Sequence, residues 1–287
     1  MILSFLSEYR YTGSPATFRW YEGQLKGLSV WCRAQGISGL GEITPTGLRL
    51  FLGDAAERGL AETTVVHRFE AARRFLDWCV EQGHLSESPM AKVRRPKAAD
   101  PAVMGFTVEE ARRLVAHSKN SAGWLAKRDT AIVTFLFGTG ARADELLHLA
   151  EACIDWGRSR VVLHGKGKKD RRVPLGPKVA LALQNYLRVR PAHPAPELWL
   201  TQRRTVMNYS TLNAMLKHLG DYAGVEECRP HRFRHTAATE LARRTTNILL
   251  VKAYLGHSKI QTTERYLRRL GVEYGEAAYE TPDGWLT

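Results

Sequence analysis

The chain has 287 residues, of which 44% are apolar, so it is long enough to bury one or two hydrophobic cores. Its 42 Lys and Arg residues outnumber 29 Asp and Glu residues and give a net charge of +13. This excess favours a polyanionic partner over a neutral small molecule, with nucleic acid ahead of an anionic membrane surface. No apolar run approaches the roughly 20 residues of a membrane-spanning helix, and the 4 cysteines have no paired spacing. We therefore expect a cytoplasmic protein that binds nucleic acid and not a membrane.

The first 92 residues carry the period of amphipathic helices. Ser14-Pro15 and Thr44-Pro45 are typical helix starts, and apolar residues then recur at three- and four-residue steps until a glycine ends each run. The pattern predicts a small helical bundle over residues 1–92. Its outward arginines can either contact DNA phosphates or lie on a solvated helix face, and they are Arg58, Arg68, Arg73 and Arg74.

Residues 93–104 lose the apolar period and mix prolines with basic residues. Pro96 and Pro101 disfavour a regular helix here, while Arg94 and Arg95 add positive charge. We interpret this stretch as a basic linker between two domains. Arg94 and Arg95 are expected to lie against the DNA backbone.

Residues 105–270 are predicted to form a second, mainly helical domain. Thr107 and Glu110 have the spacing of a capping box, and the apolar stretch 131–137 indicates a buried helix. Strand-like runs at 160–163 and 171–175 flank a Gly-rich turn and predict a β-hairpin. Further helices are expected at about 178–190, 208–222, 232–243, 247–255 and 260–270, before a tail at 271–287. The fold class is therefore mainly α with a small β-hairpin or sheet in the C-terminal domain.

Breaking a phosphodiester without a metal requires cations on the non-bridging oxygens, a nucleophile in line and an acid for the leaving oxygen. Arg142 follows a Gly-Thr-Gly break, and Glu145 one turn later can orient its guanidinium, although such pairs are usually surface pairs. His231 and Arg234 are spaced to share a helix face and offer proton transfer and a planar phosphate fork. His231 and His235 can alternatively bind a metal, but no HExxH glutamate and no nearby Asp or Cys completes a ligand set.

Other residues can supply the nucleophile and the acid. His257 follows a predicted helix end, and Tyr266 comes nine residues later among several arginines. A phenol near a polyanion can act as a nucleophile, although a lone Tyr on an amphipathic helix is most often a core residue. Lys166 at the hairpin tip can reach a leaving oxygen and give it a proton. The remaining basic residues of the hairpin are expected to contact phosphates or to form a solubilising turn, and they are Lys168, Lys169, Arg171 and Arg172.

The order of these motifs resembles that of the tyrosine recombinase family, which includes phage integrases and Xer proteins. The resemblance spans about residues 105–270 and is carried by Thr139–Leu146, Gly165–Leu175, His231–His235, Leu255–His257 and Tyr266. It implies two arginines that clamp the scissile phosphate, a lysine as general acid, one histidine that assists proton transfer and another that binds a phosphate oxygen. It also implies a tyrosine that forms a 3′-phosphotyrosyl bond. In this order these residues would be Arg142, Arg234, Lys166, His231, His257 and Tyr266, with Glu145 in support and neither cofactor nor metal.

The resemblance also implies how the protein works on DNA. The N-terminal bundle is similar to the family's core-binding domain, so the two domains would clamp double-stranded DNA that carries paired inverted half-sites. Four protomers on two DNA sites would exchange strands through a Holliday junction, with an accessory protein as a further partner. Residues 271–287 would pack either on a neighbouring protomer or on their own domain.

Two alternatives stay open at this point. A relaxing or resolving enzyme similar to type IB topoisomerases or telomere resolvases would use the same phosphotyrosine chemistry without bringing two DNA sites together. A DNA-binding accessory protein with an inactive pocket would bind DNA but not cleave it. Tetramer formation on DNA separates the first alternative from a recombinase, and covalent capture of DNA separates the second.

Overall fold

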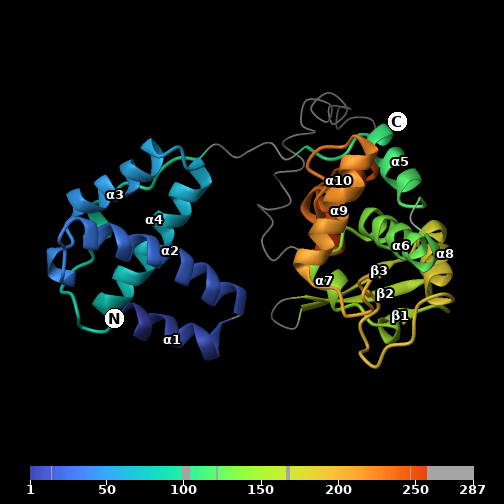
Figure 1. Cartoon of the computed structure of the whole chain (residues 1–287), viewed down its shortest axis with the longest axis horizontal. Helices are drawn as coiled ribbons and strands as arrows, with labels where there is room; N and C mark the ends of the chain where they lie inside the picture. The colour runs from blue at the N-terminus through green and yellow to red at the C-terminus, as the bar shows by residue number, and fades with distance from the viewer. Residues whose placement is uncertain (14, 99–103, 121, 166–168, 246, 257–287) are drawn as a thin grey trace, which may run out of the picture. The chain divides into compact units, whose positions relative to one another are not determined.

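The computed structural model describes residues 1–256 except 14, 99–103, 121, 166–168 and 246. The chain divides into two compact units, Met1–Pro101 and Ala102–Thr287, and each has a hydrophobic core of its own (Figure 1). The division falls inside the basic segment 93–104. Within the described part of the chain, no helix combines the length and the apolar character needed to cross a membrane.

The first unit is helical, as the periodic pattern predicts. Its described residues form α1 (Ile2–Thr12), α2 (Pro15–Ala34), the 3₁₀-helix η1 (Leu40–Glu42), α3 (Pro45–Glu57), α4 (Glu62–Glu81) and the 3₁₀-helix η2 (Pro89–Lys92). The side-chain oxygen of Thr44 accepts a hydrogen bond from the Gly47 backbone nitrogen at 3.0 Å, and Pro45 occupies the first position of α3. The helix start at Thr44-Pro45 is therefore confirmed.

The sequence pattern gives no indication of α1, yet this helix supplies the aromatic centre of the first unit. Phe5 is fully buried, and its ring meets those of Tyr21, Phe75 and Trp78 edge-on, with centroids 5.3, 5.5 and 5.6 Å away. The Trp78 indole nitrogen also donates a hydrogen bond to Glu8 of α1 at 2.7 Å. Such aromatic pairs contribute about 1 kcal/mol each beyond their buried area. Helix α1 is therefore an integral part of this core.

The second unit is mainly helical around a small antiparallel sheet. Its described elements are α5 (Val108–His117), α6 (Gly123–Thr139), α7 (Ala143–Leu147), η3 (Glu151–Cys153), β1 (Ile154–Asp155), β2 (Arg160–Gly165), β3 (Lys169–Pro174), α8 (Pro177–Leu187), α9 (Tyr209–Ala223), α10 (Pro230–Arg244) and α11 (Ile248–Leu255). The strand order is β1-β2-β3, and the β2–β3 register runs from Arg160↔Pro174 to Gly165↔Lys169. The predicted fold class and hairpin are confirmed, and β1 adds a strand that the pattern does not indicate.

Helix α6 runs through the core of the second unit and packs against α8 and α10. Trp199 stacks on Tyr186 with ring centroids 5.4 Å apart, and both side chains are fully buried. The indole nitrogen of Trp199 donates a hydrogen bond to the Leu146 carbonyl oxygen of α7 at 2.8 Å. The core therefore holds the short helix α7, which begins directly after Arg142.

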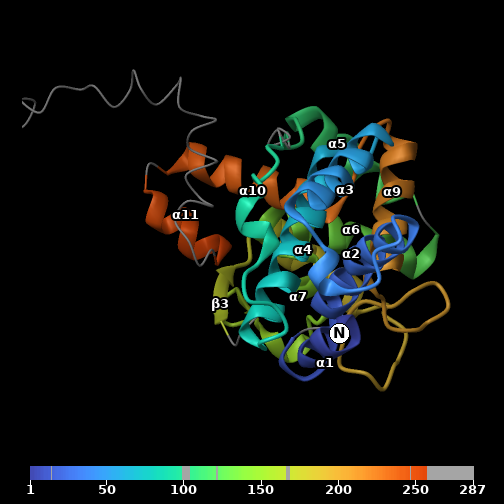
Figure 2. The ribbon, with the colours of Figure 1, turned by 90° about the vertical axis from the view of Figure 1, so that its left-hand side faces the viewer.

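Helix α10 contacts residues 104–110, which form the start of the second unit. Arg232 donates hydrogen bonds to the Met104 carbonyl oxygen at 3.2 Å and to the Glu110 carboxylate at 2.8 Å, and it lies over the Phe106 ring at 4.2 Å. Helix α11 packs on α10 and on β3, as Figure 2 shows. Helix α11 thus contacts both its neighbour in the sequence, α10, and the distant strand β3.

Candidate active site

Arg142 lies at the N-cap of α7, where a tight turn joins α7 to α6. Gly140 ends α6 in the left-handed conformation, with φ 59° and ψ 27°, which favours glycine. A Cβ atom on Gly140 would lie 3.1 Å from the Ala237 Cβ of α10 and 3.2 Å from the Leu255 Cδ2 of α11. The glycine therefore lets the backbone before Arg142 approach both helices closely.

Glu145 is the buried partner of Arg142. Its side chain is 2% exposed, and its oxygens accept hydrogen bonds from the Arg142 backbone nitrogen at 2.7 Å and the Arg142 guanidinium at 2.8 Å. Arg171 of β3 donates to both oxygens as well. Burial raises the pKa of Glu145, but the hydrogen bonds from Arg171 and Arg142 and the charge of Arg171 outweigh burial and bring the pKa below its ordinary value. Glu145 is therefore a carboxylate at neutral pH and fixes the direction of Arg142.

We expect Glu145→Gln to reduce the free energy of unfolding by about 3 kcal/mol at neutral pH, because it removes the counter-charge of the buried Arg171 guanidinium. The pKa of Glu145 is lower in the folded chain than in the unfolded chain. Its contribution is thus complete above the unfolded value of about 4.3 and is lost as the pH falls through the folded value. Urea unfolding should show a difference between variant and wild type that is constant near neutral pH and shrinks in acid. A difference independent of pH would contradict a role for the Glu145 charge.

Arg234 is 4% exposed and bridges two segments of the second unit. Its guanidinium donates hydrogen bonds to the Gly140 carbonyl oxygen at 2.8 Å and to the Leu255 carbonyl oxygen at 2.6 Å. Arg142 donates to the next carbonyl oxygen, that of Gly256, at 3.0 Å. The two arginines that the sequence analysis pairs as a phosphate clamp therefore lie together at the carboxyl end of α11.

His231 stands on α10 three residues before Arg234 and is exposed. Its Nε2 atom lies 3.1 Å from the Nε2 atom of His235, whose residue is 5% exposed. Phe233, which lies between His231 and Arg234, is fully buried. Among the residues that the structure describes, no group of three or more His, Cys, Asp or Glu is placed to hold a metal ion. The contact with His235 orients the His231 ring within reach of solvent.

Several predicted site residues lie outside the described residues, namely Lys166, Lys168, His257 and Tyr266. Strand β2 ends at Gly165 and strand β3 begins at Lys169. The described part of the chain ends at Gly256, the left-handed C-cap of α11. Of the predicted catalytic and supporting residues, the structure thus describes Arg142, Glu145, His231 and Arg234.

The side chain of Arg171 is buried, whereas a residue that contacts DNA is expected to be exposed. Its side chain is 8% exposed, and its Nε atom donates a hydrogen bond to the Tyr254 carbonyl oxygen at 2.9 Å. Arg171 pairs across the sheet with Leu163 and shares its strand face with Val173, both of which are buried. This placement favours a supporting role over the phosphate contact suggested by the sequence. The alternation of residues along β3 is the signal that could have revealed it.

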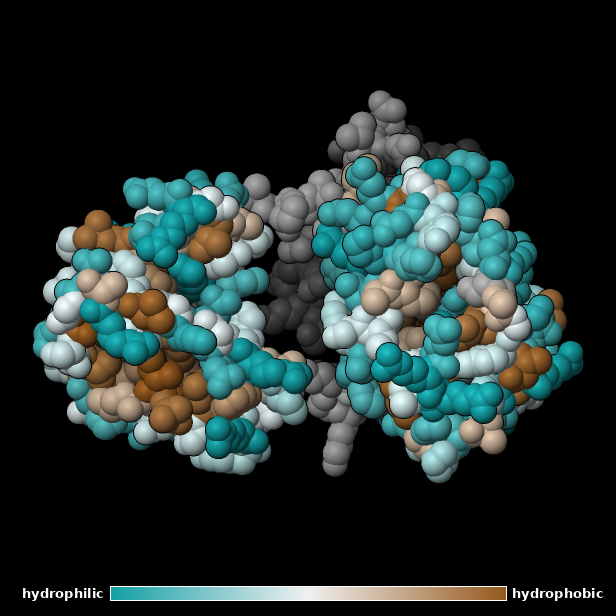
Figure 3. Space-filling model, viewed as in Figure 1, coloured by the Kyte–Doolittle hydropathy of each residue, from teal (hydrophilic) through white to brown (hydrophobic). Residues whose placement is uncertain are grey.

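The other described residues expected to contact DNA lie at the surface or near it. Four form surface ion pairs: Arg58–Asp54 at 3.1 Å, Arg73–Asp77 at 3.7 Å, Arg74–Glu81 at 2.9 Å and Arg95–Glu70 at 2.6 Å. Arg68 lies 5.4 Å from the Phe51 ring centroid, and Arg94 and Arg172 are exposed. Hydrophilic residues cover most of the second unit on the face seen in Figure 3. Surface ion pairs contribute little stability, so the four paired arginines can each exchange a carboxylate for a phosphate.

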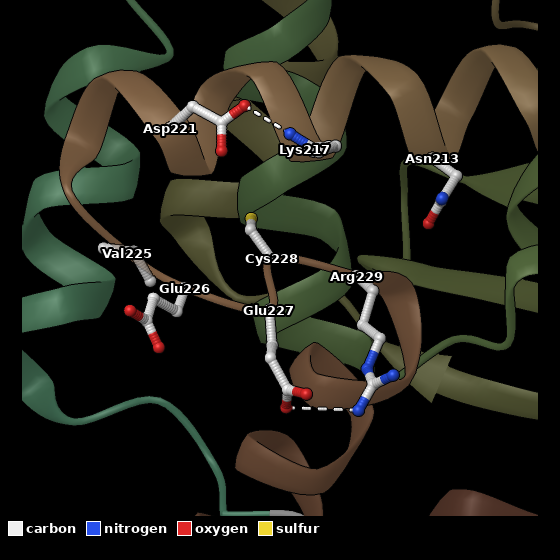
Figure 4. A pocket seen from close by; sticks show the side chains of 8 residues that line it. All are labelled: Asn213, Lys217, Asp221, Val225, Glu226, Glu227, Cys228 and Arg229. Carbon is white, nitrogen blue, oxygen red and sulfur yellow. Dashed lines mark hydrogen bonds and ion pairs between the residues drawn. The ribbon is translucent and has the colours of Figure 1, made fainter. Parts of the chain in front are cut away.

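A hollow of about 320 Å³ lies beside the end of α9, and its described lining includes none of the predicted catalytic residues. Its rim carries the ion pairs Lys217–Asp221 at 2.7 Å and Glu227–Arg229 at 3.1 Å, with Cys228 between them (Figure 4). Burial raises the pKa of the Cys228 thiol to about 12, so it is not a nucleophile at neutral pH. The hollow therefore lies apart from the candidate active site.

Gly220, near the end of α9, approaches the loop that lines this hollow. A Cβ atom on Gly220 would lie 2.5 Å from the Cys228 Cβ and 2.7 Å from the Val225 carbonyl oxygen. Because the loop backbone must then move, we expect Gly220→Ala to reduce the free energy of unfolding by about 2 kcal/mol. Thermal unfolding measures the change, with Gly176→Ala as the control because a Cβ atom there meets no described atom within 4 Å. If the two variants have the same free energy of unfolding, the loop can move away from the added Cβ atom without loss of stability.

Comparison with known proteins covers both units. The model of the phage integrase family matches residues 105–271, and that of the N-terminal SAM-like domain of phage integrases matches residues 3–83. Tyrosine recombinase XerC of Chromohalobacter salexigens is 31% identical over 259 residues, which cover 89% of this chain and 86% of that protein. Tyrosine recombinase XerC of a Mycobacterium species is 33% identical over 264 residues, which cover 88% of each chain.

Solved structures show the same fold. The XerH site-specific recombinase bound to a palindromic difH substrate has a TM-score of 0.78 at 19% identity, covering 100% of this chain and 84% of that one. The Tn1549 transposon integrase in complex with circular intermediate DNA has a TM-score of 0.75 at 17% identity, covering 92% and 93%. The chain shares with these proteins a helical unit followed by a mainly helical unit that contains a small antiparallel sheet. The chain belongs to the phage integrase family of tyrosine recombinases, the enzymes of site-specific recombination.

Proposed function

We propose that this recombinase breaks and rejoins DNA through a 3′-phosphotyrosyl bond to Tyr266 and exchanges strands between two sites through a Holliday junction. The observation that carries the proposal is the meeting of Arg142 and Arg234 at two adjacent carbonyl oxygens, directly before His257 in the sequence. Two guanidiniums at one place form a fork that matches the non-bridging oxygens of a phosphate. The Arg142 side chain is 41% exposed and therefore open to a ligand.

In the first step the phenolic oxygen of Tyr266 attacks the scissile phosphorus, and the bond from phosphorus to the 5′ oxygen breaks. The leaving 5′ oxygen takes a proton from Lys166, and a ring nitrogen of His231 accepts the proton that the phenol of Tyr266 loses. The two arginines and His257 stabilise the negative charge that develops on the non-bridging oxygens. Strand cleavage thus leaves a 3′-phosphotyrosine and a free 5′ hydroxyl.

Rejoining reverses this step with a different DNA strand. A 5′ hydroxyl of the second site attacks the phosphotyrosine, and Tyr266 leaves as the phenol. One phosphodiester bond is exchanged for another of similar energy, so the reaction needs neither ATP nor a cofactor. Glu145 supports the reaction by fixing Arg142.

We further propose the partners and domains that family membership suggests. Double-stranded DNA with paired inverted half-sites is the substrate, and four protomers assemble on two such sites, with an accessory protein as a further partner. The net charge of +13 and the DNA in the XerH and Tn1549 integrase structures support a DNA partner. We propose the cytoplasm as the place where the protein meets this DNA. Residues 1–92 form the core-binding domain, 93–104 the linker, 105–270 the catalytic domain and 271–287 a tail that packs on a neighbouring protomer or on its own domain.

The test uses a duplex recovered from a random-sequence pool by repeated binding to the wild-type chain, called here the selected duplex. A nick near the cleavage point lets a short fragment diffuse away, so that the cleaved state accumulates. Duplexes nicked at successive central positions should yield a protein–DNA adduct that survives denaturation, with the DNA on Tyr266 by mass spectrometry. Binding without an adduct at any position would favour an inactive accessory protein. Adducts without tetramers on DNA would favour a relaxing or resolving enzyme.

A further inference from the structure

The carboxyl end of α11 is held by arginines from three different parts of the second unit. Three successive carbonyl oxygens each accept a hydrogen bond from a different arginine: Tyr254 from Arg171 at 2.9 Å, Leu255 from Arg234 at 2.6 Å and Gly256 from Arg142 at 3.0 Å. The last carbonyl groups of a helix lack partners within the helix, so outside donors must satisfy them. The arginines therefore fix the place where the chain leaves α11 toward His257.

Arg171 is the member of this trio that the proposed chemistry does not use. One side of its guanidinium donates to the Tyr254 carbonyl oxygen, and the other side donates to the Glu145 carboxylate. Glu145 in turn binds both the backbone and the guanidinium of Arg142. A single side chain thus connects the carboxylate that directs Arg142 with the end of α11.

The site is shaped closely around Arg171. Gly256 has φ 64° and ψ 45°, and a Cβ atom there would lie 3.0 Å from the Arg171 Cδ and 3.3 Å from its Nη1. A guanidinium offers donors on two sides of a rigid plane, whereas the ammonium of a lysine is a single point of charge. A lysine at position 171 can therefore reach Glu145 or the Tyr254 carbonyl oxygen, but it does not hold both in this geometry.

We infer that Arg171 is a positioning residue for DNA cleavage, which aligns Arg142 through Glu145 and sets the end of α11 in register with it. This inference rests on the proposed function, because its effect on cleavage passes through Arg142. The competing view is that Arg171 only stabilises the fold by neutralising Glu145. The two views predict different effects of an Arg171 substitution on the cleavage rate of a protein in which Arg142 has already been substituted.

The experiment measures the single-turnover rate of adduct formation on the nicked selected duplex at saturating protein, below the melting temperature of every variant. We expect Arg171→Met to slow the reaction about 100-fold, because a small misplacement of a catalytic group has an effect of this size. Arg171→Lys should give an intermediate rate. Arg160→Met, at the exposed start of the neighbouring strand β2, is the matched control and should keep the wild-type rate.

The deciding measurement repeats Arg171→Met in an Arg142→Lys background. If Arg171 acts through Arg142, the second change should slow the Arg142→Lys protein by no more than about threefold. A further loss of about 100-fold would show independent action and overturn the inference, as would a wild-type rate for Arg171→Met alone. If Arg171→Met does not fold, Arg171→Lys replaces it in the same double-mutant cycle. A double variant whose loss of rate equals the product of the two single losses would then overturn the inference. An Arg142→Lys protein that cleaves at the wild-type rate would instead refute the proposed function.

Discussion

We expect Tyr266→Phe to abolish the covalent adduct with the nicked selected duplex, while the variant should bind that duplex as tightly as the wild type. Phenylalanine keeps the aromatic ring but lacks the phenolic oxygen that attacks phosphorus in the proposed mechanism, so the change removes the proposed nucleophile and little else. Denaturing gel electrophoresis measures the adduct, and a gel-shift titration measures binding. Tyr222→Phe is the control, because Tyr222 is 69% exposed on α9 and the variant should form adduct at the wild-type rate.

Two outcomes would contradict this expectation. An adduct formed by Tyr266→Phe and mapped to another residue would move the nucleophile elsewhere in the chain. Loss of DNA binding together with loss of the adduct would mean that Tyr266 serves the structure of the complex. In that case the phenol would not be assigned as the attacking group.

Arg234→Ala should reduce the rate of adduct formation by a factor on the order of 1,000, because it removes one charge-assisted donor from the scissile phosphate. The same change leaves the Gly140 and Leu255 carbonyl oxygens without this donor, so we also expect a loss of about 2 kcal/mol in the free energy of unfolding. Rates are therefore compared well below the melting temperature of the variant. Single-turnover kinetics on the nicked selected duplex give the rate.

Arg243→Ala is the matched control for this experiment, since Arg243 is exposed near the other end of α10. It should change the cleavage rate by less than about twofold, in line with the small effects of surface substitutions. An Arg234→Ala protein that is folded, binds DNA and cleaves at the rate of this control would remove Arg234 from the active site. A lower affinity with an unchanged rate at saturation would assign it to DNA binding alone.

Local patterns in the sequence predicted local features of the structure. The capping box of Thr107 and Glu110 is present at the start of α5, and most of the apolar stretch 131–137 is buried within α6 as expected. The strand-like runs form the β2–β3 hairpin. Each of these features depends on residues only a few positions apart, or on neighbouring strands, so the spacing of residue types carries the necessary information.

Other features depend on residues that are distant in the sequence. The hydrogen bonds of Arg234 to Gly140 and Leu255 join three segments, and no periodic pattern specifies such contacts. Helix α1 is short and owes its stability to an aromatic core supplied largely by α2 and α4, which explains why its own pattern was uninformative. The charge of Arg171 suggests a surface residue, whereas its place on the buried face of β3 depends on the strand register, which a basic residue does not reveal.

The end of α11 explains how a cluster of cations can persist before any DNA arrives. Guanidiniums that gather in one place repel each other, and a phosphate would ordinarily supply the missing counter-ion. Here the negative pole of the helix dipole at α11 and the Glu145 carboxylate balance Arg142, Arg171 and Arg234. In the proposed function, an incoming phosphate would meet guanidiniums that are already held in place, so little reorganisation free energy would be needed when DNA binds.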